Sequence, residues 1–213
     1  MNQRVEKFGK SQPLARVEDQ RLLTGQGRYI EDTMPEDALR AFVFRSPVAH
    51  GEITTLNVDD AREADGVHLV ITQADLVEAG IEASLDGALV KNIDGSKGAA
   101  PERPVLAGRR VRYVGEPVAV VIAETMEQAR DAAEAIVVDI AELPAVINMK
   151  DAVKEGATKV HDDLTSNLCY DWGFVEENKG AVDQAFKDAA HVTTLELVNN
   201  RLVANPMEPR VAV

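Results

Sequence analysis

Alternating and clustered apolar residues between positions 39 and 150 predict five strands. Apolar and polar residues alternate over 39–46, the spacing of a strand with one buried face. The run at 118–123 is apolar throughout and is bounded by turn residues, which is typical of a strand covered on both faces. The strands are expected at 39–46, 53–58, 67–71, 118–123 and 137–140.

Helix start signals lie between these strands. Asp59 is placed to cap a short helix that runs to Glu63. Thr72 with Asp75, and Thr125 with Gln128, have the spacing of a capping box, in which each side chain bonds the other residue's backbone. The inward face of the last helix is expected to carry Met126, Ala129, Ala133 and Ile136.

The remaining segments have weaker patterns. Residues 1 to about 35 are polar and predict an extended arm that packs on something else. The stretch 81–108 is rich in glycine and proline and predicts a long, mobile or ligand-facing loop. Residues 151–190 predict a connector wrapped on a surface, with a short helix at 151–153, a strand at 168–172 and a helix at 181–186.

The C-terminal segment predicts the start of a new unit. A strand is expected from His191, and Val211-Ala212-Val213 reads as another. A strand without a following partner exposes its edge and its apolar face. This indicates a chain that is truncated or completed by another polypeptide; the alternative is a terminal strand that pairs back onto the domain.

Charge and cysteine content narrow the classes of function. The chain of 213 residues has 23 Lys and Arg against 36 Asp and Glu, a net charge of −13. This charge disfavours nucleic acid and anionic lipid as partners, although it is also explained by solubility alone. The only cysteine, Cys169, excludes an intramolecular disulfide and a cysteine cluster for zinc or iron–sulfur. Without an apolar stretch of signal-peptide or membrane-span length, a cytoplasmic location is expected.

No catalytic or metal-binding residue emerges from the motifs. His50, His68, His161 and His191 are scattered, without the spacing of a zinc site. Gly25-x-Gly27 does not complete a dinucleotide fingerprint and is interpreted as a turn. Glu116, between Gly115 and Pro117, is the most interesting carboxylate, and a structural turn is the first interpretation of it.

A series of motifs in a fixed order resembles one family over almost the whole chain. The chain is similar to large subunits of the xanthine dehydrogenase and aldehyde oxidase family of molybdenum hydroxylases, above all to the branch containing aerobic carbon monoxide dehydrogenase. The segments that carry the resemblance are Arg16–Asp19, Arg21–Tyr29, Arg45–Gly51, Tyr113–Ala119, Ala129–Ala135, Glu142–Val146 and Pro206–Arg210.

The resemblance implies an α+β fold with four parts. These are an extended arm over 1–19, an α/β hammerhead domain over 20–150, a linker over 151–190, and the first strands of a molybdopterin-binding domain over 191–213. The loop 81–108 is expected to border a substrate channel. Glu208 lies within the last motif, and a buried salt bridge with Arg210 or another arginine is expected of it.

The resemblance also implies an activity when the subunit is complete. That activity is the hydroxylation or oxidation of an aldehyde, an N-heterocycle or carbon monoxide at molybdenum on molybdopterin, in the cytosine dinucleotide form. Iron–sulfur clusters and FAD would be held by a small and a medium partner subunit, in a homodimer of heterotrimers. The cofactor contacts and the catalytic glutamate are expected after Val213, so the chain alone is expected to be inactive. The alternative is a non-catalytic assembly module that keeps only the hammerhead domain and binds a partner through residues 1–35.

Overall fold

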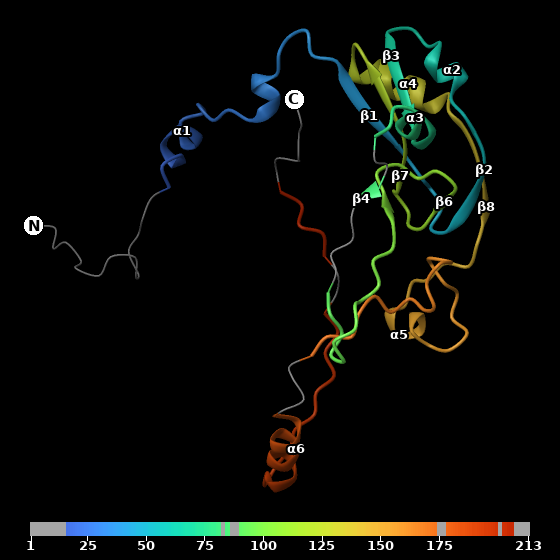
Figure 1. Cartoon of the computed structure of the whole chain (residues 1–213). Helices are drawn as coiled ribbons and strands as arrows, with labels where there is room; N and C mark the ends of the chain where they lie inside the picture. Colours follow the sequence, from blue (N-terminus) through green and yellow to red (C-terminus); the bar gives the residue numbers. More distant parts are fainter. Residues whose placement is uncertain (1–15, 82–83, 86–89, 174–177, 200–201, 207–213) are drawn as a thin grey trace, which may run out of the picture. The chain divides into compact units, whose positions relative to one another are not determined.

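The computed structural model describes residues 16–81, 84–85, 90–173, 178–199 and 202–206. The chain divides into two compact units, one formed by Leu39–Leu195 and the other by Met1–Ala38 with Glu196–Val213. The larger unit contains two three-stranded sheets and one two-stranded sheet (Figure 1). It carries all the sites discussed below.

The first sheet, called sheet A, has the strand order β1-β7-β3 and is antiparallel throughout. Its members are β1 (Arg40–Arg45), β7 (Pro117–Ala123) and β3 (Val67–Thr72). The central strand β7 buries Ala119 and Val121 in one core cluster and Val118 in a second. The prediction of a strand covered on both faces is therefore confirmed.

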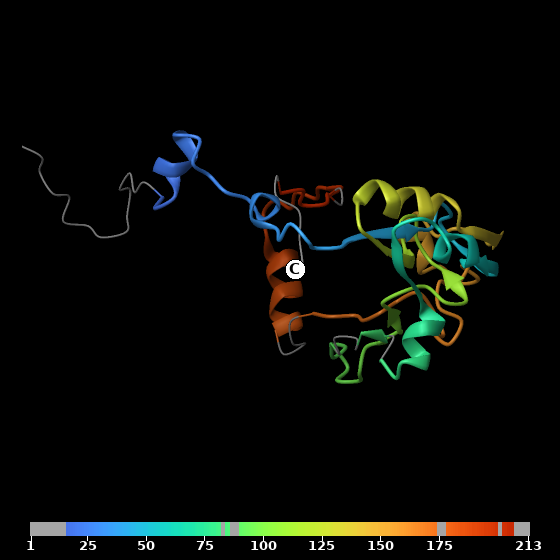
Figure 2. The ribbon, with the colours of Figure 1, turned by 90° about the horizontal axis from the view of Figure 1, so that it is seen from above.

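Helices α2 (Asp59–Arg62) and α4 (Met126–Glu134) contribute to the core of sheet A. Figure 2 shows α4 lying along one face of this sheet. The helix presents Ala129, Ala132 and Ala133, all buried, and such small side chains allow the helix backbone to lie close to the strands. Ala132 belongs to this inward face although it was missing from the sequence prediction.

The helix caps follow two of the three predictions. Thr125 and Gln128 form a capping box at α4, with the Thr125 hydroxyl accepting the Gln128 N–H at 3.2 Å. Thr72 and Asp75 form the same motif at α3 (Gln73–Glu78). The prediction for α2 was wrong, because Asp59 is the first helical residue and the N-cap position is held by Val58, which makes no side-chain cap bond. The side-chain oxygen of Asn57 accepts the Asp59 N–H at 2.8 Å, just before the helix. Asp59 therefore lies one residue beyond the position from which a side chain caps the helix.

The second three-stranded sheet, called sheet B, has the order β6-β2-β8. It consists of β6 (Arg110–Val111), β2 (Gly51–Asn57) and β8 (Val137–Glu142). The cluster around Val111 and Val118 fills the space between the two sheets. Gly51 is required where β2 meets β8, because a Cβ there would lie 2.4 Å from Ile140 Cγ2 and 2.9 Å from the Ala141 oxygen.

The predicted loop 81–108 contains a small sheet, β4 (Ser84–Leu85) paired with β5 (Arg103–Pro104). Part of the loop also pairs with the segment 169–171. The Ala99 N–H donates to the Cys169 carbonyl at 2.6 Å, and the Ile93 N–H donates to the Asp171 carbonyl at 2.8 Å. The strand expected at 168–172 does not form as a ladder, because these bonds reach irregular loop backbone rather than a neighbouring strand.

Beyond sheet B the chain forms two further helices, α5 (Met149–Ala152) and α6 (Lys179–Asp188). The strand expected from His191 is absent: residues 191–199 have no regular structure and are exposed. A strand needs hydrogen-bonded neighbours, and within the described ranges no strand pairs with this segment. None of the described helices is long and apolar enough to cross a membrane.

The smaller unit departs from the predicted extended arm. It contains the short helix α1 (Asp19–Leu23) and the 3-10 turn η1 (Ile30–Thr33). Local bonds stabilise these turns, including that from the Tyr29 N–H to the Asp32 carboxylate at 2.8 Å. The predictions for Glu208, Arg210 and a strand over 211–213 concern residues outside the described ranges, as does most of the predicted arm over 1–19.

Candidate functional site

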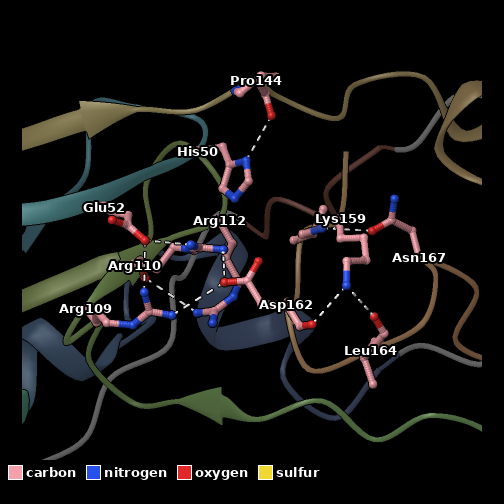
Figure 3. A network of polar contacts seen from close by, with 11 residues as sticks. His50, Glu52, Arg109, Arg110, Arg112, Pro144, Lys159, Asp162, Leu164 and Asn167 are labelled. Carbon is pink, nitrogen blue, oxygen red and sulfur yellow. Dashed lines mark hydrogen bonds and ion pairs between the residues drawn. The ribbon is translucent and has the colours of Figure 1, made fainter. Parts of the chain in front are cut away.

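A ring of four charged side chains lies where sheet B meets the segment after α5. Arg110 on β6 donates from Nη2 to Glu52 Oε1 on β2 at 2.7 Å, and its Nη1 lies 2.6 Å from Asp162 Oδ2 (Figure 3). Arg109 contacts the same two carboxylates, at 2.9 Å and 3.6 Å. The two positive guanidinium groups and the two negative carboxylates therefore give the ring no net charge.

Burial differs sharply within this ring. The Arg110 side chain is 8% exposed, whereas Arg109, Asp162 and Glu52 are 68%, 54% and 42% exposed. Arg110 is thus the member that is withdrawn from water, and both of its terminal nitrogens find carboxylate partners. Its Nε has no partner among the described residues.

The hydrogen bonds of Arg110 shift the titration of its partners. The bond from Arg110 lowers the pKa of Glu52, and a second bond from Arg110 lowers the pKa of Asp162. The same two bonds raise the pKa of Arg110, and the bond to Glu52 has the larger effect. All three shifts favour the ionised forms, as expected for close opposite charges.

A cleft of about 440 Å³ opens beside the ring. Arg109, Arg110 and Arg112 line it on the side of sheet B, and His161, Asp162 and Asp163 line it from the segment after α5. Burial lowers the pKa of His161, and the nearby Arg112 lowers it further. A neutral imidazole is therefore favoured in the cleft wall at neutral pH.

His50 is buried and joins two distant parts of the chain. Its Nδ1 donates to the Pro144 carbonyl at 2.9 Å, and its own carbonyl accepts the Leu143 N–H at 2.8 Å. The imidazole therefore fastens the chain leaving β8 to the start of β2. Its Nε2 is buried and has no partner among the described side chains and backbone groups.

Glu116 lies in a turn, as the first interpretation of the sequence had it. Its side chain accepts the Arg112 N–H, and the residue is 4% exposed. Gly115 has a φ of +88°, a conformation that L side chains rarely adopt. Backbone bonds from Gly115 to Ser46 and from Ser46 to Glu116 fasten the turn to the end of β1.

The other residues singled out in the sequence do not converge. His68 lies 3.7 Å from Glu124 on the surface, and His191 and Cys169 are exposed. In the part of the chain that the structure describes, no three His, Cys, Asp or Glu side chains are grouped so as to hold a metal ion. The charged ring can hold and orient ionic groups, but its described residues include no nucleophile that is hydrogen-bonded to a base.

Sequence reasoning missed the charged ring. The signal was Arg109-Arg110-Val111-Arg112, which places three cations just after a long loop and at the start of a strand. The carboxylate partners of Arg110 could not be predicted from the sequence, because Glu52 and Asp162 lie 58 and 52 positions away from it along the chain.

Comparison with known proteins finds relatives that are similar over most of this chain. The model of the aldehyde oxidase and xanthine dehydrogenase a/b hammerhead domain matches residues 24–144. The large subunit of nicotine 6-hydroxylase from Paenarthrobacter nicotinovorans is 37% identical over 95% of this chain and 23% of its own length. The carbon monoxide dehydrogenase large chain of Hydrogenophaga pseudoflava is 30% identical over 90% of this chain and 24% of its own.

Solved structures agree with these matches. Quinoline 2-oxidoreductase from Pseudomonas putida 86 aligns with a TM-score of 0.61 and 40% identity, over 72% of this chain and 19% of that one. A Cu,Mo-containing carbon monoxide dehydrogenase aligns with a TM-score of 0.64 and 26% identity, over 84% and 22%. The chain thus spans about a quarter or less of the length of these relatives. With more than half of its residues matched to the hammerhead domain, the chain belongs to the aldehyde oxidase and xanthine dehydrogenase family.

Proposed function

We propose that this chain is the N-terminal part of the large subunit of a molybdenum-dependent hydroxylase that acts on an N-heterocyclic compound. The observation that carries the proposal is the 37% identity to the nicotine 6-hydroxylase large subunit across 95% of the chain. So long a match, together with the hammerhead fold, supports common descent of the domain and a related role.

The substrate class follows from which relatives are more similar. Two relatives named for N-heterocycles, nicotine 6-hydroxylase and quinoline 2-oxidoreductase, share 37% and 40% identity with the chain. Two carbon monoxide dehydrogenases share 30% and 29%. The aldehyde oxidoreductase of Megalodesulfovibrio gigas shares 29%. An N-heterocycle is therefore favoured over carbon monoxide or an aldehyde, although the residues that contact substrate are proposed to lie outside this chain.

We propose that the cofactor of such an enzyme is held outside the described residues of this chain. The described residues group no candidate metal ligands, and the guanidinium groups of Arg109 and Arg110 already have carboxylate partners. No chemical step is therefore assigned to this chain, and no catalytic residue is proposed in it. Molybdopterin, in its cytosine dinucleotide form, is proposed to bind the remainder of the large subunit.

The proposed assembly follows the family. Iron–sulfur clusters and FAD are proposed to lie on a small and a medium subunit, and the complex is proposed to be a cytoplasmic homodimer of heterotrimers. Within the chain, the hammerhead domain is proposed to span 20–150, with the arm before it and the linker 151–190 after it. The family match over 24–144 lies within the proposed hammerhead domain.

The test is to produce the complete reading frame together with the genes for its partner subunits. Metal analysis is expected to give one molybdenum per large subunit. Steady-state assays with nicotine, quinoline, an aromatic aldehyde and carbon monoxide are expected to give the highest kcat/KM for an N-heterocycle. A stable complex that contains no molybdenum would contradict the enzyme proposal and favour the non-catalytic assembly module. A molybdenum enzyme that prefers the aldehyde or carbon monoxide would contradict the substrate class alone.

A further inference from the structure

The segment 151–167, called the strap, is organised by its own hydrogen bonds. The Asn167 side chain accepts the Val160 N–H at 2.9 Å and donates to the carbonyls of Ala152 and Thr158 at 2.9 and 2.8 Å. The Lys159 ammonium donates to two further strap carbonyls, those of Asp162 and Leu164, both at 3.0 Å (Figure 3). The strap is therefore a folded loop within the segment 151–190, which the sequence predicted to be a connector wrapped on a surface.

Charged groups meet where the strap contacts sheet B. Asp162 extends from the strap to the Arg110 guanidinium at 2.6 Å, and Arg109 lies at 3.6 Å from the same oxygen. Glu52, on the central strand of sheet B, holds the opposite side of Arg110 at 2.7 Å. Arg110 is thus fixed from the sheet, and the strap attaches to it through one carboxylate.

We propose that Arg110 and Asp162 form a latch that holds the strap on sheet B, with Glu52 as the positioning residue for Arg110. The latch also contributes to the 440 Å³ cleft, because His161, Asp162 and Asp163 of the strap line it together with the three arginines. When the latch opens, these strap residues leave the cleft, and the segment between β8 and α6 is no longer held on sheet B. This inference does not depend on the proposed enzymatic activity.

Burial explains why Arg110 rather than Arg109 holds the strap. Ion pairs between exposed groups contribute little, since water solvates both partners and salt screens them. With the strap in place, Arg109 is 68% exposed and is solvated by water, whereas Arg110 is 8% exposed and depends on its carboxylate partners. Loss of Asp162 therefore leaves a nearly buried guanidinium with half of its carboxylate partners, which is unfavourable.

Hydrogen exchange of the full chain tests the latch. Asp162→Asn removes the charge while keeping the shape of the side chain, and Asp163→Asn makes the same change one position along, at an exposed residue. In Asp162→Asn the strap amides, among them that of Val160, are expected to exchange roughly tenfold faster or more, while β7 amides keep their protection. Glu52→Gln is expected to give a weaker acceleration in the same amides, because it loosens Arg110 rather than the strap.

Three outcomes would overturn the latch. Strap exchange in Asp162→Asn could equal that of the parent chain, which would mean that the strap is held by its other contacts. Equal acceleration by Asp163→Asn would point to a general effect of charge on the segment. Loss of protection in β7 as well would show that Asp162 supports the whole unit rather than the strap.

Discussion

Sheet A and sheet B belong to one compact unit but bury different chemistry. The face of sheet A under α4 is closed by alanines and valines, among them Val121 and Ala129, which are fully buried. The end of sheet B under the strap is closed by Arg110 with its two carboxylates. Apolar burial has no directional requirement, whereas paired charges need specific partners. The first region should therefore determine whether the unit folds, and the second should determine where the strap lies.

The largest expected effect tests the apolar region directly. Val121→Asp places a carboxylate in the centre of sheet A without a partner, which costs at least about 4 kcal/mol and is enough to unfold a domain of ordinary stability. Circular dichroism and urea unfolding of the purified chain are expected to show loss of the cooperative transition.

The matched control is Val137→Asp, at a valine that is 51% exposed on β8. Its free energy of unfolding is expected to stay within about 0.5 kcal/mol of the parent value, as for most surface substitutions. Unfolding by both variants would mean that the loss comes from placing a carboxylate in a strand rather than from burying it in sheet A.

The second effect tests how closely α4 packs. Ala132→Leu adds three carbon atoms to a residue that is 1% exposed and is expected to lower the free energy of unfolding by about 1–3 kcal/mol through overpacking. Glu134→Leu, on the exposed side of the same helix, is expected to have little effect. Urea denaturation of the two variants measures the difference. A stabilised Ala132→Leu variant would reveal unfilled space between the helix and sheet A.

The apolar region could be predicted from the sequence because its signals are local. The continuous run of β7 and the Thr125–Gln128 capping box each lie within a few residues, and both were predicted correctly. The fold class followed from the order of motifs along the chain. The strand expected from His191 failed for the opposite reason, since strand formation depends on a neighbour that periodicity cannot reveal.

The charged region could not be predicted, because its members are far apart in the chain. Arg110, Glu52 and Asp162 each resemble an ordinary surface charge in the sequence, and only the fold brings them together. The same holds for His50, whose partner Pro144 is 94 positions away. Residue type could suggest these groups as candidates, but their pairing depends on the register of β2 with β6 and β8.

A smaller effect is expected at the start of α4. Thr125→Ala removes the side chain that accepts the Gln128 N–H and should lower the free energy of unfolding by about 1 kcal/mol. Thr125→Ser keeps the hydroxyl and should restore most of this loss. Thermal unfolding followed by circular dichroism gives the comparison. A loss of the same size in both variants would assign the effect to the threonine methyl group rather than to the cap.

The smallest effect is expected in mild acid and should separate the two regions by pH. The folded pKa of His161 is lowered, so the stability gained from its neutral form is present above its ordinary pKa and declines as pH falls below that value. The pKa values of Glu52 and Asp162 are also lowered, so their contribution is present above the ordinary carboxyl range and is lost as pH falls through their folded values. Protection factors of strap amides are therefore expected to fall in two steps as the pH is lowered, first near the histidine range and then in the carboxyl range. The protection of β7, whose buried residues carry no titratable groups, is expected to fall only at lower pH.

His161→Gln should abolish the first step and leave the second, because the ring of arginines and carboxylates remains. A strap and a β7 strand that lose protection together at every pH would mean that the charged end of sheet B unfolds only with the apolar core.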